Sequence, residues 1–425
     1  MNESATLQPS VTDVCAAAKL ASRELGAAPA EVRNKALKKV ASLLRERTDA
    51  ILEANAEDLG GERAAGLTSA LRDRLILNAD RIEAMAEGVE AVISIDDPVG
   101  EEIEHRTLAS GLDLRKVRVP LGVVAVVYEA RPNVTIDCAA LCIKSGNAVV
   151  LRGSSYAHHS NTALAKIVRE GIEHAGLPTG AVQILDGGRE ELAELATRKD
   201  SIDLIIPRGG DGLKRALEAV ATVPVMYAAS GNCHVYVHAD ADVDMARKIV
   251  LNAKTSRPGV CNAAETLLVN AEIAADFLPA TLRELDAAGV EIRGDARVAA
   301  LAPEGIDVVA ATGEDWGTEY HDLILAVGVV DSLGEAIDHI GKYGSGHSEA
   351  IVTGSPAKAG AAFTTAVDAA SLYINASTRF SDGFEFGMGA EIGNSTQKLH
   401  ARGPIGLREL TTTKSVLTGD GQTRG

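Results

Sequence analysis

The stretch VVAVVYEARPNVTIDCAALCIKSGNAVVLRGSS, residues 123–155, decides the fold of this chain. It begins with an uninterrupted apolar run at 123–127, which is typical of a strand buried on both faces. A helical pattern follows at 135–144 and ends at Gly146, and a second apolar strand follows at 148–151. A strand, a helix and a strand in so short a stretch predict two parallel strands joined by a right-handed crossover.

The same alternation continues towards the C-terminus. The next elements expected are helix 160–175, strand 182–185, helix 190–198, strand 203–206 and helix 212–220. From His234 a second series of strands and helices runs to about residue 374. We therefore predict an α/β protein with two doubly wound domains, the first of a nucleotide-binding type.

The rest of the chain has a different character. The first hundred residues follow helical spacing, and Thr12-Asp13 is expected to cap a helix at 14–24. Residues 114–119 and 407–417 are strand-like but lie outside the alternating regions. The predicted domains are 1–112 with 124–230, and 231–374; residues 113–123 and 375–417 are assigned to an arm and connecting segments, and 418–425 to a polar tail.

Size, charge and cysteine content exclude several classes of function. The formal net charge of −17 argues against a general nucleic-acid-binding surface and against binding to anionic membranes. We see neither a secretory signal nor an apolar run long enough to span a membrane. The five cysteines of this 425-residue chain do not suggest a disulfide framework, so a cytoplasmic protein is expected. An anionic substrate would require a local group of Arg or Lys side chains.

Cys261 is the strongest candidate for a catalytic residue. It lies in the turn TSRPGVCN, residues 255–262, with Arg257 four residues upstream. A thiol in a turn beside a cation favours the nucleophilic thiolate, whereas a buried core cysteine is the alternative, and the pattern alone does not decide between them. The buried interpretation is preferred for Cys15, Cys138 and Cys142, and no metal site is expected.

Two other motifs lie at the predicted carboxyl ends of strands, where open α/β sheets bind ligands. Asn133, in YEARPN at 128–133, could donate to an oxyanion, although a helix cap is the more common role of such an Asn. Arg152 and Ser154, in LRGSS at 151–155, could hold a phosphate, although the motif also fits an ordinary strand-to-helix turn.

A further motif opens a predicted helix. Gly209 and Gly210 could cradle a dinucleotide phosphate at the helix N-terminus. The motif lacks the full G-x-G-x-x-G fingerprint, so it is weak on its own. The sequence contains no Walker-type loop and no recognisable Ser-His-Asp set.

Taken in order, these motifs resemble the aldehyde dehydrogenase superfamily and, within it, the γ-glutamyl phosphate reductases. The matching pieces are YEARPNVT at 128, LRGSS at 151, IPRGG at 206, GNCHVYV at 231, SRPGVCNAAETLLV at 256, HSEAIVT at 347, NASTRF at 375, DGFEFGMGAEIGNST at 382 and RGPIGLREL at 402. Each piece is weak alone, but the ordered set is highly specific. The resemblance implies an aldehyde dehydrogenase-like fold, with two doubly wound α/β domains plus a small β oligomerisation arm.

The resemblance also implies roles for individual residues. Cys261 matches the catalytic cysteine of the superfamily, and Asn133 matches its oxyanion asparagine. Arg152 falls where the superfamily has a basic residue near the adenosine ribose or its 2′-phosphate, which implies NADP(H). The expected cofactor-binding residues are Arg152, Ser154, Gly209, Gly210 and Glu319, the last resembling the glutamate that holds the nicotinamide ribose.

The implied substrate, L-glutamyl 5-phosphate, carries phosphate and carboxylate groups. The candidate cations at the matching motifs are Arg131, Lys144, Arg257, Arg379 and Arg402, and at least two of them are expected to be structural. Arg257 is the first choice for the phosphate and Arg379 for the α-carboxylate, with Arg131 as a third substrate-binding residue. His234 and His347 are expected to be structural.

One departure from the hydrolytic aldehyde dehydrogenases is informative. Those enzymes carry a Glu general base just before the glycine that opens the catalytic domain, whereas Tyr227-Ala228-Ala229-Ser230 precedes Gly231 here. Because a hydrolytic enzyme needs that base to activate water, its absence favours exchange with phosphate.

The sequence therefore predicts NADPH-dependent reduction of L-glutamyl 5-phosphate to L-glutamate 5-semialdehyde through a Cys261 thioester. A hydrolytic NAD(P)-dependent aldehyde dehydrogenase acting on a small aldehyde is the alternative. A non-catalytic scaffold is disfavoured because Cys261 and Asn133 are retained. The expected partners are further copies of the chain, in a homodimer or homotetramer, and glutamate 5-kinase; neither nucleic acid nor membrane is expected.

Overall fold

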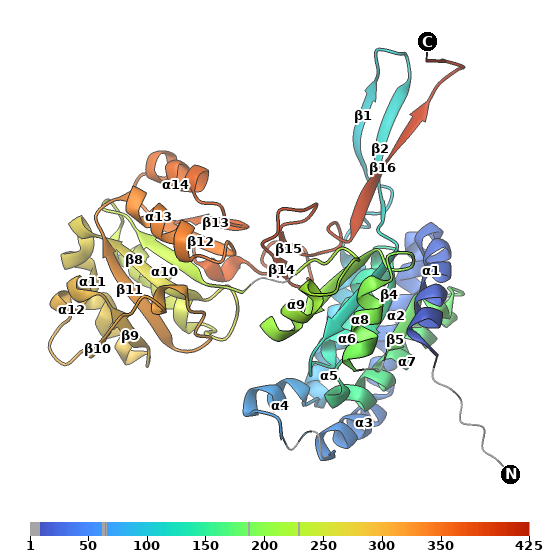
Figure 1. Cartoon of the computed structure of the whole chain (residues 1–425), viewed down its shortest axis with the longest axis horizontal. Helices are drawn as coiled ribbons and strands as arrows, with labels where there is room; N and C mark the ends of the chain where they lie inside the picture. Colours follow the sequence, from blue (N-terminus) through green and yellow to red (C-terminus); the bar gives the residue numbers. More distant parts are fainter. Residues whose placement is uncertain (1–8, 62–63, 65, 186–187, 228–229, 425) are drawn as a thin grey trace. The chain divides into compact units, whose positions relative to one another are not determined.

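The computed structural model describes residues 9–61, 64, 66–185, 188–227 and 230–424. The chain forms two compact units (Figure 1). Unit 1 consists of Met1–Tyr227, Gly387–Gly393 and Ile405–Gly425, and unit 2 of Ala228–Phe386 and Asn394–Pro404. The chain thus leaves unit 1, builds unit 2 and returns. Among the described helices, none combines the length and apolar character needed to cross a membrane.

A four-stranded parallel sheet forms the centre of unit 1, in the order β5-β4-β3-β6. The strands are β3 (Val123–Tyr128), β4 (Ala148–Arg152), β5 (Val182–Leu185) and β6 (Leu204–Arg208). Every residue of β3 is buried, as its uninterrupted apolar run requires. Val123 pairs with Ala148 and Val124 with Leu204, both in parallel, so the crossover predicted from residues 123–155 is confirmed.

Helices surround this sheet. They are α1 (Val11–Ala27), α2 (Ala30–Glu46), α3 (Thr48–Gly60), α4 (Ser69–Leu75), α5 (Ala79–Ser94), α6 (Asn133–Lys144), α7 (His158–His174), α8 (Arg189–Thr197) and α9 (Asp211–Glu218), with short turns η2 (Ser155–Ala157) and η3 (Thr179–Ala181). The cap predicted for the first helix was wrong. Ser10 is the N-cap, and Asp13 completes a capping box with it, because a Ser followed three residues later by an acidic side chain satisfies two backbone N–H groups at once.

Unit 2 contains a seven-stranded parallel sheet in the order β10-β9-β11-β8-β7-β12-β13. Its strands are β7 (Cys233–Val237), β8 (Ala264–Asn270), β9 (Glu291–Gly294), β10 (Val308–Ala310), β11 (Ile324–Val330), β12 (Ser348–Val352) and β13 (Ser371–Ile374). Its helices are α10 (Val243–Thr255), α11 (Ala271–Ala287), α12 (Ala296–Leu301), α13 (Leu333–Tyr343) and α14 (Ala361–Ala366). The shorter elements are η4 (Asp315–Gly317), η5 (Pro356–Gly360), η6 (Thr378–Phe380), β14 (Asn394–Ser395) and β15 (Gly403–Pro404).

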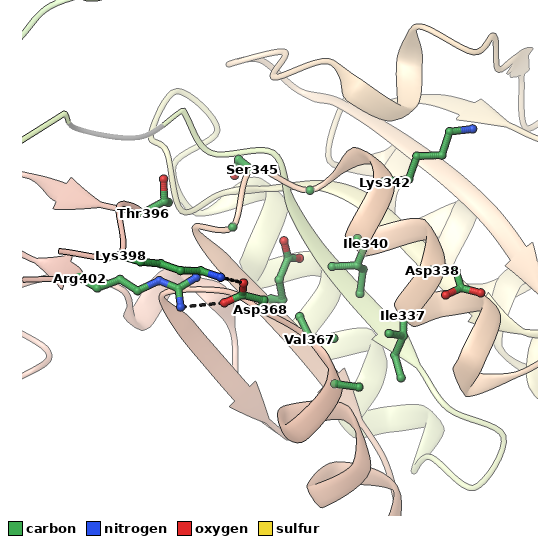
Figure 2. Close-up of a pocket in the computed structure, with 15 residues that line it drawn as sticks. Ile337, Asp338, Ile340, Lys342, Ser345, Val367, Asp368, Thr396, Lys398 and Arg402 are labelled. Atoms are coloured by element: carbon green, nitrogen blue, oxygen red, sulfur yellow. Dashed lines mark hydrogen bonds and ion pairs between the residues drawn. The ribbon is translucent and has the colours of Figure 1, made fainter.

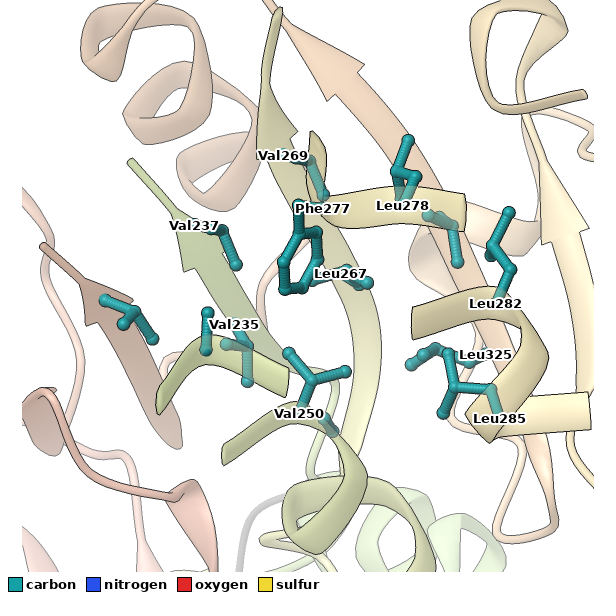
Figure 3. Packing of buried hydrophobic residues seen from close by; sticks show 14 of the residues in the cluster. Val235, Val237, Val250, Leu267, Val269, Phe277, Leu278, Leu282, Leu285 and Leu325 are labelled. Carbon is teal, nitrogen blue, oxygen red and sulfur yellow. The ribbon is translucent and has the colours of Figure 1, made fainter. Parts of the chain in front are cut away.

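A core of aliphatic side chains lies on one face of this sheet. Figure 3 shows Val235 of β7 and Leu267 of β8 packed with Val250 of α10 and Phe277 of α11. The other face is covered around Phe363 of α14 and Ile340 of α13. Helices on both faces of a parallel sheet in each unit confirm the predicted aldehyde dehydrogenase-like α/β fold class.

The two strand-like segments outside the alternation do pair. β16 (Thr411–Thr418) runs antiparallel to β2 (Asp113–Pro120), from Thr411 opposite Pro120 to Thr418 opposite Asp113. β1 (Glu102–Thr107) lies on the other side of β2, so the arm has three strands rather than two (Figure 1). The strand expected from residue 407 begins only at 411, because Leu407 and Leu410 are buried in unit 1 before the arm starts.

Candidate active site

The carboxyl edge of the unit 1 sheet brings several of the predicted residues together. The loop after β3 and the loop after β6 are neighbours, because Tyr128 pairs with Arg208 in the parallel register. The chain moves from β3 through β4 to β5 on one side and then crosses to β6 on the other side of β3. In open α/β sheets such a change of direction opens a crevice that binds ligands.

Asn133 is the first residue of α6, and its side chain is exposed at this edge. It is not a helix cap, since Pro132 is the N-cap residue and no side chain caps this helix. Its Nδ2 instead donates to Oδ2 of Asp137, at 2.9 Å. Burial raises the pKa of Asp137 to about 6, against the effects of the Asn133 hydrogen bond and the Arg208 charge. Arg131 is half-buried in the tight turn before the helix.

The end of β4 offers polar groups beside this edge. Arg152 pairs with Val127 of β3, and its Nη2 donates to the Gly188 carbonyl at 2.8 Å. Burial lowers the pKa of Arg152. The Oγ of Ser154 is buried and has no hydrogen-bond partner among the described residues, so it could accept or donate a bond to a bound molecule.

The glycines after β6 differ in their surroundings. A Cβ on Gly209 would lie 2.9 Å from both Glu129 and Leu213, so this position is closely packed. Gly210 has open space where a Cβ would be, and it precedes α9, whose N-terminus no side chain caps. A helix N-terminus that no side chain caps is a place where backbone N–H groups can bind an anionic phosphate. Ser154 and Gly210 are thus the predicted cofactor-binding residues at this edge whose polar groups or surroundings are unfilled.

Cys261 lies in unit 2, in the loop between α10 and β8, and is half-buried. The backbone of Gly231 packs directly against it, since a Cβ on Gly231 would stand 1.5 Å from the Cys261 carbonyl oxygen. The Gly231 N–H donates to Oε1 of Glu319 at 2.6 Å, and Oε2 of Glu319 lies 3.3 Å from His321 Nε2. Glu319, predicted as a cofactor ligand, is therefore placed beside the nucleophile loop. Of the run before Gly231, Ala228 and Ala229 lie outside the described residues.

Two guanidinium groups lie close to Cys261. Arg379 donates from Nε to Ser256 Oγ at 2.9 Å and from Nη1 to Asn262 Oδ1. Burial, and next the neighbouring Arg257 charge, lower the pKa of Arg379, whereas Asp382 and Cys261 act in the opposite direction. Arg257 is exposed. Two of the predicted cations thus lie near the Cys261 loop of an otherwise acidic chain.

A buried ion pair ties the two ends of the Cys261 loop together, and the sequence reading missed it. Lys254 in α10 donates to Glu265 Oε2 in β8 at 2.6 Å, and both side chains are fully buried. The other oxygen, Oε1, accepts the His321 N–H at 3.3 Å. Burial raises the pKa of Glu265 to about 7 and lowers the pKa of Lys254. The ion pair holds both the nucleophile loop and the Glu319 segment.

His234, His347 and the three cysteines that were predicted to lie in the core are buried. His234 is buried with Nδ1 3.0 Å from Glu349 Oε2, and His347 is buried against Ser348 and Cys233. Cys15, Cys138 and Cys142 are all buried, and burial raises the pKa of Cys15 to about 11 and of Cys142 to about 12. No three His, Cys, Asp or Glu side chains in the described part of the chain could hold a metal ion together.

Two of the five candidate cations have other partners. Lys144 is buried in unit 1 and donates to Asn34 Oδ1 and to the Ile93 carbonyl, both at 2.9 Å. Arg402 lines a cavity of about 710 Å³ in unit 2 and pairs with Asp368 at 2.8 Å, and Lys398 points to the same carboxylate (Figure 2). None of the residues around this cavity belongs to the Cys261 loop.

Comparison with known proteins agrees with this geometry. The model of the aldehyde dehydrogenase family matches residues 4–303.

The chain belongs to the aldehyde dehydrogenase family.

Its relatives within the family are γ-glutamyl phosphate reductases. The enzyme of Heliobacterium modesticaldum is 53% identical over 408 residues, which cover 96% of this chain and 97% of the relative. The enzyme of Thermobifida fusca is 52% identical over 98% of this chain and 99% of its own. The crystal structure of the Thermotoga maritima γ-glutamyl phosphate reductase superimposes with a TM-score of 0.94 at 45% identity, covering 98% of this chain and all of that one. The predicted family is confirmed, and members of this family use a nicotinamide cofactor.

Proposed function

We propose that this chain catalyses the NADPH-dependent reduction of L-glutamyl 5-phosphate to L-glutamate 5-semialdehyde with release of phosphate, the second step of proline biosynthesis from glutamate. The observation that carries the proposal is the setting of Cys261. The thiol is half-buried, its loop is fixed by Gly231 and by the Lys254–Glu265 ion pair, and Arg257 and Arg379 lie beside it. The near full-length similarity to γ-glutamyl phosphate reductases supports the substrate.

In the first step, the Cys261 thiolate attacks the acyl carbon of the substrate. A C–S bond forms, the C–O bond to phosphate breaks, and the phosphate leaves with the electron pair. The Asn133 amide donates a hydrogen bond to the oxyanion that forms on the way, which lowers the barrier. Arg257 binds the phosphate, Arg379 the α-carboxylate, and Arg131 is a third substrate-binding residue.

In the second step, the thioester on Cys261 is reduced. When bound, the nicotinamide cofactor supplies the hydride that reduces the thioester carbon. The resulting thiohemiacetal oxyanion collapses, the C–S bond breaks, and the Cys261 thiolate is regenerated as the aldehyde leaves. The Asn133 amide donates a hydrogen bond to the oxyanion in both steps, so the mechanism needs no other hydrogen-bond donor from a side chain at the acyl carbon.

The residues proposed to take part in NADP(H) binding are Arg152, Ser154, Gly209, Gly210 and Glu319. In unit 1, Ser154, Gly209 and Gly210 bind the phosphates, and Arg152 binds the 2′-phosphate, which gives NADP its preference over NAD. In unit 2, Glu319 binds the nicotinamide ribose. Unit 1 is then the cofactor-binding domain and unit 2 the catalytic domain.

The hydrolytic alternative is less well supported. A water molecule that attacks the thioester needs a carboxylate base, and Ser230 is the residue immediately before Gly231. Glu319 is the carboxylate beside Gly231, and its Oε1 is already occupied by the Gly231 N–H. Phosphate, which arrives as an anion and is held by arginines, needs no such base.

We further propose that the arm of β1, β2 and β16 joins subunits in a homodimer or homotetramer, and that the enzyme works in the cytoplasm, where it associates with glutamate 5-kinase. The arm carries exposed apolar side chains at Ile103, Val416 and Leu417. Ribbons of few strands gain stability from packing against another surface, which a second subunit would provide.

Phosphate dependence of the reverse reaction tests the function. The purified chain is mixed with L-glutamate 5-semialdehyde and NADP⁺, with and without inorganic phosphate, and absorbance of NADPH is followed. We expect turnover only when phosphate is present. Equal turnover without phosphate, with glutamate as the product, would instead establish the hydrolytic alternative.

A further inference from the structure

Asp137 and Asn133 form a pair at the start of α6. Residues four apart on a helix lie on the same face, and the Asn133 Nδ2 donates to Asp137 Oδ2 at 2.9 Å. The pair has no part in capping, because Pro132 is the N-cap and no side-chain oxygen caps this helix. Asn133 is exposed, whereas Asp137 is half-buried behind it.

Stability alone does not account for this carboxylate. Among the described residues, the Asn133 amide is the hydrogen-bond partner of the Asp137 side chain. Burial raises the pKa of Asp137 to about 6 even though the Asn133 hydrogen bond and the Arg208 charge both act to lower it. A partly desolvated carboxylate with one neutral donor costs folding free energy. Departures from the most stable choice of residue are concentrated at functional sites.

The chemistry of the pair suggests its use. A terminal amide has a C=O end and an NH₂ end of nearly the same shape, so an exposed Asn can present either. An ionised carboxylate only accepts hydrogen bonds, and it therefore holds the NH₂ end of Asn133 towards itself. The second N–H on Nδ2 then stays available for an acceptor outside the helix, whereas the carbonyl end, which would repel an oxyanion, is turned away.

We propose that Asp137 is a positioning residue, whose carboxylate selects the orientation of the Asn133 amide that can donate to the oxyanion at the acyl carbon. The inference rests on the proposed function, in which Asn133 is the oxyanion donor. Asp137 itself does not contact the reacting atoms. Replacement of Asp137 should therefore lower kcat by disturbing Asn133. It should not change the fold, cofactor binding or the reactivity of the Cys261 thiol.

A double-mutant cycle tests the proposal with L-glutamate 5-semialdehyde, NADP⁺ and phosphate. Loss of an oxyanion donor in Asn133→Ala should lower kcat by about 100- to 1,000-fold. Asp137→Asn, which can hold the amide in either orientation, should lower kcat by about 10- to 100-fold, with KM changed less than about twofold. The double variant should be no slower than Asn133→Ala alone, because Asp137 has nothing left to position.

The outcomes separate the two levels of the proposal. If the wild type is active and the loss of kcat in the double variant equals the product of the losses in the two single variants, the positioning role of Asp137 is overturned but the proposed function stays intact. A wild-type enzyme without phosphate-dependent turnover would overturn the proposed function itself. Asp80→Asn is the matched control, since it removes an exposed acidic side chain from the first turn of α5 in the same unit, and wild-type kcat is expected.

Two further readouts distinguish positioning from a structural role. The groups that act on Asp137 are the Asn133 amide and the Arg208 guanidinium, with the Cys138 thiol adjacent on α6. A protonated Asp137 no longer selects one orientation of the Asn133 amide, so the kcat of the wild type should fall as the pH drops below about 6. Asp137→Asn should not show this fall in kcat at low pH. If the variant shows the same fall, the proposal is contradicted. Asp137→Glu, which restores a carboxylate, should recover part of kcat, and alkylation of Cys261 by iodoacetamide should proceed at the wild-type rate in all variants.

Discussion

Cys261 combines access to solvent with a fixed backbone. Its loop is held by hydrogen bonds and an ion pair that do not involve the thiol itself, so removal of the sulfur should leave the loop in place. We expect Cys261→Ala to fold and to bind NADPH, and to lose turnover because the covalent path is gone. Turnover above about one per cent of wild type would contradict the assignment, since such losses are usually far larger. Cys15→Ala, at a buried cysteine of α1, serves as the control and should keep full turnover.

Arg152 should decide which cofactor is used. If its guanidinium binds the 2′-phosphate, Arg152→Ala should raise KM for NADPH and leave the use of NADH nearly unchanged. The expected loss is about 1.5–3 kcal/mol, the size of a charge-assisted hydrogen bond. Arg169→Ala is a matched control, because Arg169 is also half-buried in unit 1 and donates to a backbone carbonyl, that of Val182 at 2.8 Å. Equal weakening towards both cofactors would be evidence against the role of Arg152.

At the scale of elements, the Lys254–Glu265 ion pair joins α10 to β8 across the nucleophile loop. Removal of one partner leaves the other charge buried without compensation, so Lys254→Met should lower the free energy of unfolding by about 3–5 kcal/mol. Lys254→Met combined with Glu265→Leu should recover most of this loss, because the remaining charge is then also removed. Urea unfolding of the wild type, of Lys254→Met and Glu265→Leu alone, and of the double variant measures both quantities. A double variant as unstable as the sum of the two single variants would mean that the side chains do not act as a pair.

Two histidines, the half-buried His339 and the buried His347, couple the stability of unit 2 to pH. Burial lowers the pKa of both His339 and His347 to about 4, whereas an unfolded histidine titrates near 6.5. Between these values the unfolded chain binds more protons than the folded one, so stability is lost as the pH falls from 6.5 towards 4. Each histidine contributes up to about 1.4 kcal/mol per pH unit in this window.

Urea unfolding at pH 7 and pH 5 measures this contribution. His347→Gln should reduce the pH dependence of stability, because glutamine does not titrate. An unchanged pH dependence in His347→Gln would contradict the linkage.

The sequence predicted most elements, because the long parallel strands are continuous apolar runs and the helices between them have regular spacing. The elements that it missed are short or charged. β9 has only four residues, and β1 has the sequence EIEHRT, almost entirely exposed, so neither shows an apolar pattern.

At the site, Asn133 and Asp137 are four apart on one helix, so their pairing could have been read from spacing. Lys254 and Glu265, or Gly231 and Glu319, meet only through the tertiary fold, and no local pattern indicates these contacts.

At the scale of the whole molecule, the arm provides a test of assembly. A cut after Arg402 would also remove Ile405 and Leu410, which are buried in unit 1, so the structure favours a cut after Leu410 that removes only β16 and the tail. We expect the shortened chain to fold and to lose its self-association, because β2 is left with an unpaired edge and an incomplete surface. Sedimentation at micromolar concentration distinguishes the outcomes. A shortened chain that remains dimeric, or a full-length chain that sediments as a monomer, would refute the proposed arm.

The return of the chain to unit 1 has a consequence for synthesis on the ribosome. Unit 2 is a nearly continuous segment and can fold as soon as it has emerged, but unit 1 receives Ile405, Leu407 and Leu410 only from the last part of the chain. The part of unit 1 that these side chains cover therefore stays uncovered while the whole of unit 2 is translated. β16, which follows these residues, can pair with β2 only after the whole of unit 2 has been translated. A chain released before residue 405 would carry a finished unit 2 on an unfinished unit 1, which exposes apolar surface for proteases to recognise.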